Sequence, residues 1–153
     1  MEWELPNGVH VLLEDSNLFR CLRVLVTGQE EGVVRAVTCD VRMVLDVTPG
    51  TEILEAVQNA DTPAERKNAI LRAAAGPPDA FLAALHESVS TALRDPDHEV
   101  RVAARRFVEE TLWEEFLPVL DELIDGGDLP EGADAVRILH EIISLATKHP
   151  DAE

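Results

Sequence analysis

The chain has 153 residues and a strongly acidic composition, with 30 Asp and Glu against 13 Lys and Arg and a formal net charge of −17. Hydrophobic residues make up 46% of the sequence, enough to bury a core, so we expect a folded protein of a single domain spanning residues 1–153. A negative protein repels phosphate, which argues against nucleic acids and anionic membranes as partners. No apolar run is long enough to predict a bilayer span.

Two features predict the cellular compartment. The first residues, MEWELPNG, lack the basic and apolar segments of a secretory signal. The cysteines, Cys21 and Cys39, are too few for a disulfide framework. Together these features predict a cytoplasmic protein with reduced thiols.

Residues 1–50 are rich in β-branched residues and predict an antiparallel β-hairpin or meander. Apolar runs at 9–13 and 18–27 predict two strands, and a third follows at 37–47, where every second residue is apolar. The segment 28–32 then forms the loop of a hairpin between the second and third strands.

That hairpin predicts two cross-strand pairs. It places Cys21 opposite Cys39 and Arg20 opposite Asp40. We also expect both cysteines to be core thiols, with a redox pair as the alternative.

A helix is the alternative for residues 18–47. Val34, Val37, Val41, Val44 and Leu45 also fit the 3.6-residue period of a helix. Because the branched side chain of valine disfavours helices, the pattern at 37–47 favours a strand, and the helical alternative stays open.

Residues 51–150 are rich in Ala, Leu and Glu and predict six helices. Breakers at residues 76–78, 95–97 and 126–132 separate apolar segments of helical spacing. The second helix is expected to begin at Asp61-Thr62-Pro63, and Asp79 to cap the third. The last helix carries five residues on its expected core face, which are Val136, Leu139, Ile142, Ile143 and Ala146.

Three arginines recur at a regular interval in this helical part. Arg66, Arg101 and Arg137 are 35 and 36 residues apart, each near the start of the second helix of an expected pair. The clearest copy is the segment 93–104, LRDPDHEVRVAA. Its motif residues are Asp95, Pro96, Asp97, Glu99, Val100, Arg101, Ala103 and Ala104.

This segment resembles the HEAT repeat family, most specifically over residues 79–112. The resemblance is weaker at 51–75 and partial at 114–147. It implies a stack of antiparallel helix pairs and a structural ladder in which the arginines Arg66, Arg101 and Arg137 pair with loop acids such as Asp95 and Asp97. We therefore predict an α+β protein with a β-rich part at 1–50 and a HEAT-like helical part at 51–150. An all-α HEAT-like solenoid is the alternative.

No motif for catalysis, cofactor binding or metal binding appears in the sequence. It contains no phosphate loop, dinucleotide fingerprint, HExxH or CxxC, and no two histidines have the i,i+4 spacing of a helical metal site. We therefore predict a protein that is not an enzyme and that has no catalytic residues, no cofactor and no metal.

A long acidic segment is the most informative surface feature. Residues 109–134 contain ten acids and no Lys or Arg, with Trp113 and Phe116 among them. A solvated face would account for the acids, whereas a docking surface for a basic protein is the functional interpretation. The candidate partner-binding residues are Glu109, Glu110, Glu114, Glu115, Asp121, Glu122 and Asp125.

The sequence thus predicts a non-enzymatic protein–protein interaction module, a small adaptor or regulator with an acidic helical surface. The alternative is an acidic inhibitor or immunity protein that neutralises a basic partner such as a nuclease. In both cases the expected partner is another protein with a basic surface, neither a nucleic acid nor a membrane.

Overall fold

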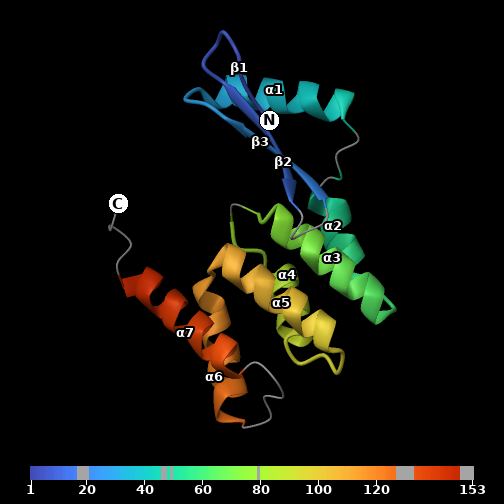
Figure 1. The fold of residues 1–153 in the computed structure, drawn as a ribbon, viewed down its shortest axis with the longest axis vertical. Helices are drawn as coiled ribbons and strands as arrows, with labels where there is room; N and C mark the ends of the chain where they lie inside the picture. The colour runs from blue at the N-terminus through green and yellow to red at the C-terminus, as the bar shows by residue number, and fades with distance from the viewer. Residues whose placement is uncertain (17–20, 46–47, 49, 79, 127–132, 149–153) are drawn as a thin grey trace. The chain divides into compact units, whose positions relative to one another are not determined.

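The computed structural model describes residues 1–16, 21–45, 48, 50–78, 80–126 and 133–148. Within them a three-stranded antiparallel sheet is followed by seven α-helices and one short 3₁₀ helix (Figure 1). The chain divides into two compact units, an N-terminal unit at Met1–Pro49 and a helical unit at Gly50–Glu153. The α+β class predicted from the sequence is confirmed.

The sheet consists of β1 (Glu2–Glu4), β2 (His10–Ser16) and β3 (Cys21–Thr27) in the order β1-β2-β3. A tight turn joins β1 to β2, in which the Leu5 amide donates to the Val9 carbonyl at 2.8 Å. Gly8 has a φ of 74°, a conformation that glycine adopts without steric cost. Asn7-Gly8 is a pair typical of hairpin turns, and the sequence analysis did not predict this hairpin.

The predicted third strand at 37–47 is wrong. Within its described part the chain forms α1 (Glu31–Val44), and the third strand of the sheet is β1, at the N-terminus. Residues 46 and 47 lie outside the described residues. The predicted hairpin loop at 28–32 instead leads from β3 into the first turn of α1.

Packing on the sheet explains why this valine-rich segment is helical. Val33, Val34, Val37 and Val41 recur at helical spacing and are all half-buried, and α1 packs against β3. Cys39, an apolar position of the expected strand, is exposed on the opposite side. Burial of one helical stripe therefore outweighs the weak helix propensity of valine.

The predicted pairing of the two cysteines is also wrong. Cys21 lies opposite Ser16 in the β2–β3 register, and Cys39 belongs to α1. Because Cys39 is exposed, it is not a core thiol. Asp40 lies in α1 as well, whereas Arg20 falls outside the described residues.

The N-terminal unit has a thin core. Among the residues of this unit whose burial the structure describes, which leave out 15–23, 46, 47 and 49, only Val9 is buried, and α1 contains no buried residue. A methyl group on Gly28 would meet Val34 Cγ2 at 3.0 Å and Val9 Cγ2 at 3.1 Å. The helix and the sheet thus approach closely where Gly28 has no side chain.

Six of the seven α-helices, together with the 3₁₀ helix, build the helical unit (Figure 1). Their bounds are α2 (Gly50–Gln58), α3 (Pro63–Ala75), α4 (Ala83–Ala92), α5 (His98–Thr111), η1 (Glu114–Phe116), α6 (Leu117–Asp125) and α7 (Ala133–Lys148). The expected cap Asp79 lies outside the described residues, and α4 begins after Leu82.

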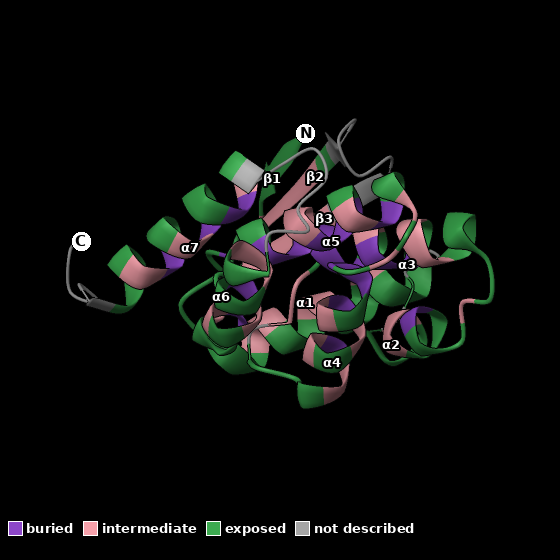
Figure 2. Ribbon diagram, turned by 90° about the horizontal axis from the view of Figure 1, so that it is seen from below, coloured by how far each residue is buried: buried purple, intermediate pink, exposed green. Residues whose placement is uncertain are grey.

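Alanines form much of the core of the helical unit. Ala73 and Ala74 on α3 and Ala103 and Ala104 on α5 are all buried, and α3 packs along α5. Small side chains let two helix backbones approach closely. Figure 2 shows the buried residues gathered on single sides of these helices, as expected for an amphipathic pair.

The last helix only partly follows its predicted face. Val136, Leu139 and Ile143 are buried as expected, whereas Ile142 and Ala146 are exposed. Because α7 packs mainly on α6, one side of the helix is buried and the apolar residues on its other side remain in contact with solvent.

No helix among the described residues has the length and apolar character needed to cross a bilayer.

Candidate functional site

A capping box starts α3. The Glu65 amide donates to Thr62 Oγ1 at 3.2 Å, and the Thr62 amide donates to Glu65 Oε2 at 3.0 Å. These two bonds satisfy amides that a helix N-terminus otherwise leaves free. The hydrogen bond from the Thr62 backbone is the main cause that holds the pKa of Glu65 below its ordinary value.

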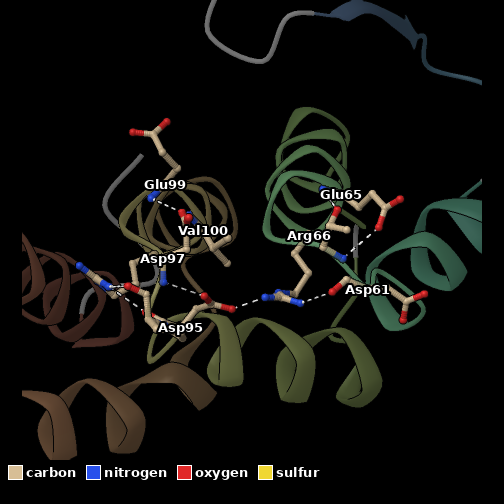
Figure 3. Close-up of polar contacts among 10 residues, drawn as sticks. Asp61, Glu65, Arg66, Asp95, Asp97, Glu99 and Val100 are labelled. Carbon is tan, nitrogen blue, oxygen red and sulfur yellow. Dashed lines mark hydrogen bonds and ion pairs between the residues drawn. The ribbon is translucent and has the colours of Figure 1, made fainter.

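Two aspartates organise the loop that leads from α4 into α5. Asp97 is the N-cap of α5, and its Oδ1 accepts hydrogen bonds from the amides of Glu99 and Val100 (Figure 3). The Asp97 amide in turn donates to Asp95 Oδ1 at 2.9 Å. The loop therefore holds the Asp95 carboxylate in a defined position.

Arg66, on the first turns of α3, reaches this loop. Its Nε donates to Asp95 Oδ2 at 3.0 Å, and its Nη1 donates to the Asp61 carbonyl at 3.1 Å (Figure 3). The side chain of Asp95 is only 10% exposed and that of Arg66 30%. This partly shielded ion pair joins the start of α3 to the loop before α5.

The other two arginines of the expected ladder differ from Arg66. Arg101 Nη1 donates to the carbonyls of Asp95 and Pro96 at 2.8 and 2.9 Å, so it binds backbone oxygens of its own loop. Arg137 is exposed, and no ion pair between described residues includes it. The loop at 127–132 that precedes α7 lies outside the described residues.

A second ion pair lies along the same helix interface. Lys67 Nζ, on α3, is 2.9 Å from Glu99 Oε2, on the first turn of α5. The hydrogen bond from Lys67 is the main cause that holds the pKa of Glu99 below its ordinary value, and the Lys67 charge adds to it. The Lys67–Glu99 pair thus joins α3 to the first turn of α5, beside the Arg66–Asp95 pair that joins α3 to the preceding loop.

An aromatic cluster packs between α4, α5 and η1. Phe116 and Phe107 are fully buried, and their ring centroids lie 6.3 Å apart. Trp113 stacks on Phe116 at 6.0 Å and meets the edge of Phe81 at 5.1 Å. The His86 ring completes the cluster 4.6 Å from Phe116. Trp113 and Phe116 therefore serve the core, although acids flank them in the sequence.

The seven candidate acids lie on three consecutive elements of the helical unit. All of them are exposed. Glu109 and Glu110 lie in the last turn of α5, Glu114 and Glu115 belong to η1, and the other three, Asp121, Glu122 and Asp125, belong to α6.

Three of these acids lie within 4 Å of a basic side chain, two of them paired with arginines and one beside a histidine. Glu109 pairs with Arg106 on the same helix, and Glu122 pairs with Arg94, which follows the C-cap of α4. Asp121 Oδ1 lies 3.0 Å from His140 Nε2 on α7. Arg94 and His140 lie far from Glu122 and Asp121 in the sequence, so spacing alone could not predict these two contacts.

The remaining four acids, from the last turn of α5, from η1 and from the end of α6, are together called the open acidic surface. Glu110, Glu114, Glu115 and Asp125 are exposed and form no ion pair with a described residue. Among the described residues, no existing ion pair would be lost if these carboxylates bound an incoming base.

No group of three or more His, Cys, Asp or Glu side chains in the described part of the chain is arranged to hold a metal ion.

Comparisons with known proteins give no relative for this chain: no family model matches it, and no curated protein or solved structure does.

Proposed function

We propose that the chain is a non-enzymatic interaction module that binds a protein with a basic surface through its helical unit. The observation that supports this function most is the open acidic surface: Glu110, Glu114, Glu115 and Asp125 are exposed without an ion-pair partner among described residues. Such carboxylates speed association with a basic partner and disfavour acidic ones.

The helical unit is proposed to be HEAT-like. Three successive helix pairs, α2–α3, α4–α5 and α6–α7, each pack internally, and α3 also packs along α5. The Arg66–Asp95 ion pair links the first two of these pairs. Stacked helix pairs offer extended surfaces to other proteins, which fits an adaptor or regulator.

The test compares capture of proteins from a lysate of the source organism by two variants and the wild-type chain. The open-surface variant carries E110Q, E114Q, E115Q and D125N. The control variant carries E4Q, E14Q, D40N and E55Q, which remove the same number of charges from exposed positions elsewhere. Both variants leave every ion pair between described residues intact.

We expect wild-type and control chains to capture the same basic protein at low salt, with capture falling as salt rises. The open-surface variant should lose it. Equal capture by both variants, or a partner that is acidic, would contradict the proposed function.

An acidic inhibitor or immunity protein is the second candidate, favoured by the net charge of −17. The two functions predict different effects on the activity of the captured partner. An inhibitor abolishes the activity of a basic enzyme such as a nuclease at a one-to-one ratio, whereas an adaptor leaves the activity of its partner in place.

A further inference from the structure

The 3₁₀ helix η1 lies between α5 and α6 and carries Glu114 and Glu115, two of the four acids of the open acidic surface. It has three residues, and its first hydrogen bond runs from the Phe116 amide to the Trp113 carbonyl at 3.1 Å. A 3₁₀ helix of this length has little stability of its own, because its hydrogen-bond geometry is poor. Contacts with other elements must therefore hold it in place.

The turn that leads into η1 adds to this requirement. Leu112, the C-cap of α5, has a φ of 49° and a ψ of 30°, a left-handed conformation that residues other than glycine seldom adopt. Such a conformation persists only where the surrounding structure compensates its steric cost. The fully buried side chain of Phe116 supplies one such contact, at the last residue of η1.

His86 on α4 supplies a contact to the part of η1 that carries the acids. Its Nε2 lies 3.0 Å from the Glu115 carbonyl oxygen, and no other side chain among the described residues forms a hydrogen bond with the backbone of η1. The His86 ring centroid lies 4.6 Å from that of Phe116 and 5.5 Å from that of Phe81. Because two rings pack against it, the imidazole keeps Nε2 directed at η1.

This contact specifies the tautomer of His86. A carbonyl oxygen only accepts hydrogen bonds, so Nε2 must carry a proton in order to donate one. The Ser90 hydroxyl lies 3.5 Å from the same nitrogen and would donate to it if it were bare. A bare Nε2 would then face the Glu115 carbonyl lone pairs at 3.0 Å, which is unfavourable. The shorter distance therefore favours the Nε2–H tautomer.

We propose that His86 is a positioning residue of the open acidic surface: as the Nε2–H tautomer it holds the backbone of η1 to α4 and so fixes the segment that carries Glu114 and Glu115. A segment that is already ordered favours binding, because it loses less conformational entropy when a partner arrives. This role in binding rests on the proposed function, whereas the hydrogen bond and the order of η1 do not.

Two substitutions separate the hydrogen bond of His86 from the packing of its ring. H86F keeps a ring beside Phe116 and removes the donor, whereas H86Q removes the ring and keeps an N–H donor at the end of its side chain. H98F is the matched control, since His98 is an exposed histidine at the start of α5. Circular dichroism checks that all three variants keep their helices.

NMR of the full chain without any partner gives the first readout. We expect the ring ¹H–¹⁵N spectrum of the wild type to place the proton of neutral His86 on Nε2. The Phe116 amide should exchange about fivefold faster in H86F, the factor expected for the loss of one net hydrogen bond. It should exchange at the wild-type rate in H86Q and H98F. The Arg66 amide, bonded to the Thr62 carbonyl at the start of α3, should not change in any variant.

Partner binding gives the second readout, in the capture test of the proposed function. We expect H86F to capture less of the basic protein than the wild type, and H86Q and H98F to capture as much. Recovery in H86Q would assign the effect to the hydrogen bond, because a residue that only fills space would not be replaced by glutamine.

Four outcomes would overturn the inference. The first is a proton on Nδ1 of neutral His86 in the wild type. The second is a Phe116 amide that H86F leaves unchanged. The third is equally faster exchange at Arg66 and Phe116 in H86F, since His86 would then stabilise the whole unit and not η1. The fourth is equal capture by H86F and the wild type.

The experiment separates this inference from the proposed function. If E110Q/E114Q/E115Q/D125N captures its partner normally, the open acidic surface falls, while faster Phe116 exchange in H86F still shows that His86 holds η1. If that variant loses capture and H86F does not, the open acidic surface stands and the positioning role of His86 falls.

Discussion

The two units of the chain bury apolar side chains to very different extents. The helical unit holds nearly all the residues that the structure describes as buried, among them Phe107, Phe116 and Leu120, and its helices share polar links. The N-terminal unit buries Val9 among its described residues, and Met43 and Val44 at the end of α1 are highly exposed. Because buried apolar area supplies most of the stability of a fold, we expect the helical unit to be the more stable of the two.

The two units also differ in whether local sequence or tertiary packing selects their helices. In the helical unit, alanine and capping residues favour helices before any packing occurs. In the N-terminal unit, valines disfavour the helix that they form in α1, so only contact with the sheet can select it. The unit with the weaker core thus depends more on tertiary contacts.

The largest expected effect comes from the aromatic cluster. Phe107→Ala removes a fully buried ring that contacts Trp113 and Phe116. It should lower the free energy of unfolding by about 3–5 kcal/mol, as large-to-small core substitutions do. Urea unfolding followed by helical circular dichroism measures the loss. A change below about 1 kcal/mol would mean that the cluster is not the core of the helical unit.

The alanine interface between α3 and α5 should tolerate no larger residue. Ala104→Leu adds three carbons to a fully buried position, and we expect a loss of about 1–3 kcal/mol from overpacking. Ala64→Leu is the control, since Ala64 is exposed on α3. Thermal unfolding of both variants measures the difference. Equal melting temperatures would show that α3 and α5 do not pack closely.

The Arg66–Asp95 ion pair should contribute less. A double-mutant cycle with R66M and D95N is expected to give a coupling of about 1 kcal/mol, because Arg66 remains partly exposed. The matched cycle with R94M and E122Q, a more exposed pair, should give a smaller value. If the second coupling exceeds the first, shielding does not strengthen the link between α3 and the loop before α5.

The smallest effect concerns pH. Lys67 lowers the pKa of Glu99 in the folded chain, so the pair stabilises the fold above the unfolded pKa of Glu99. That stabilisation is lost as the pH falls through the lowered folded pKa. In K67M the pKa of Glu99 should rise toward its ordinary value of 4.5. NMR titration of the carboxyl carbons measures it.

Glu65 is the internal control for that titration. Hydrogen bonds from Thr62, and not the Lys67 side chain, lower the pKa of Glu65. This pKa should therefore be the same in the wild type and in K67M. An unchanged Glu99 pKa in K67M would show that Lys67 does not lower the pKa of Glu99.

The sequence predicts the helical unit well because its signals are local. Thr62 and Pro63 mark the start of α3, and Asp97 marks the start of α5, through hydrogen bonds to nearby amides. The alternation at 37–47 misleads because valine fits both periods, and only the contact of α1 with the sheet decides between them.

In the candidate site, too, local features could be predicted from the sequence and tertiary contacts could not. The exposure of the acids follows from their charge, whereas their pairing does not follow from spacing. Arg94 and His140 approach Glu122 and Asp121 from other helices, which only the tertiary fold brings together. The solvent-facing position of Ile142 likewise depends on where α6 contacts α7, since helical spacing alone allows either face.

Amide hydrogen exchange on the intact chain tests the contrast between the two units most directly. We predict the slowest exchange in α3 and α5, whose facing sides are buried, and exchange at least about a hundredfold faster in α1, β2 and β3. Equal protection of α1 and α5 would contradict the account, because the N-terminal unit would then be as stable as the helical unit.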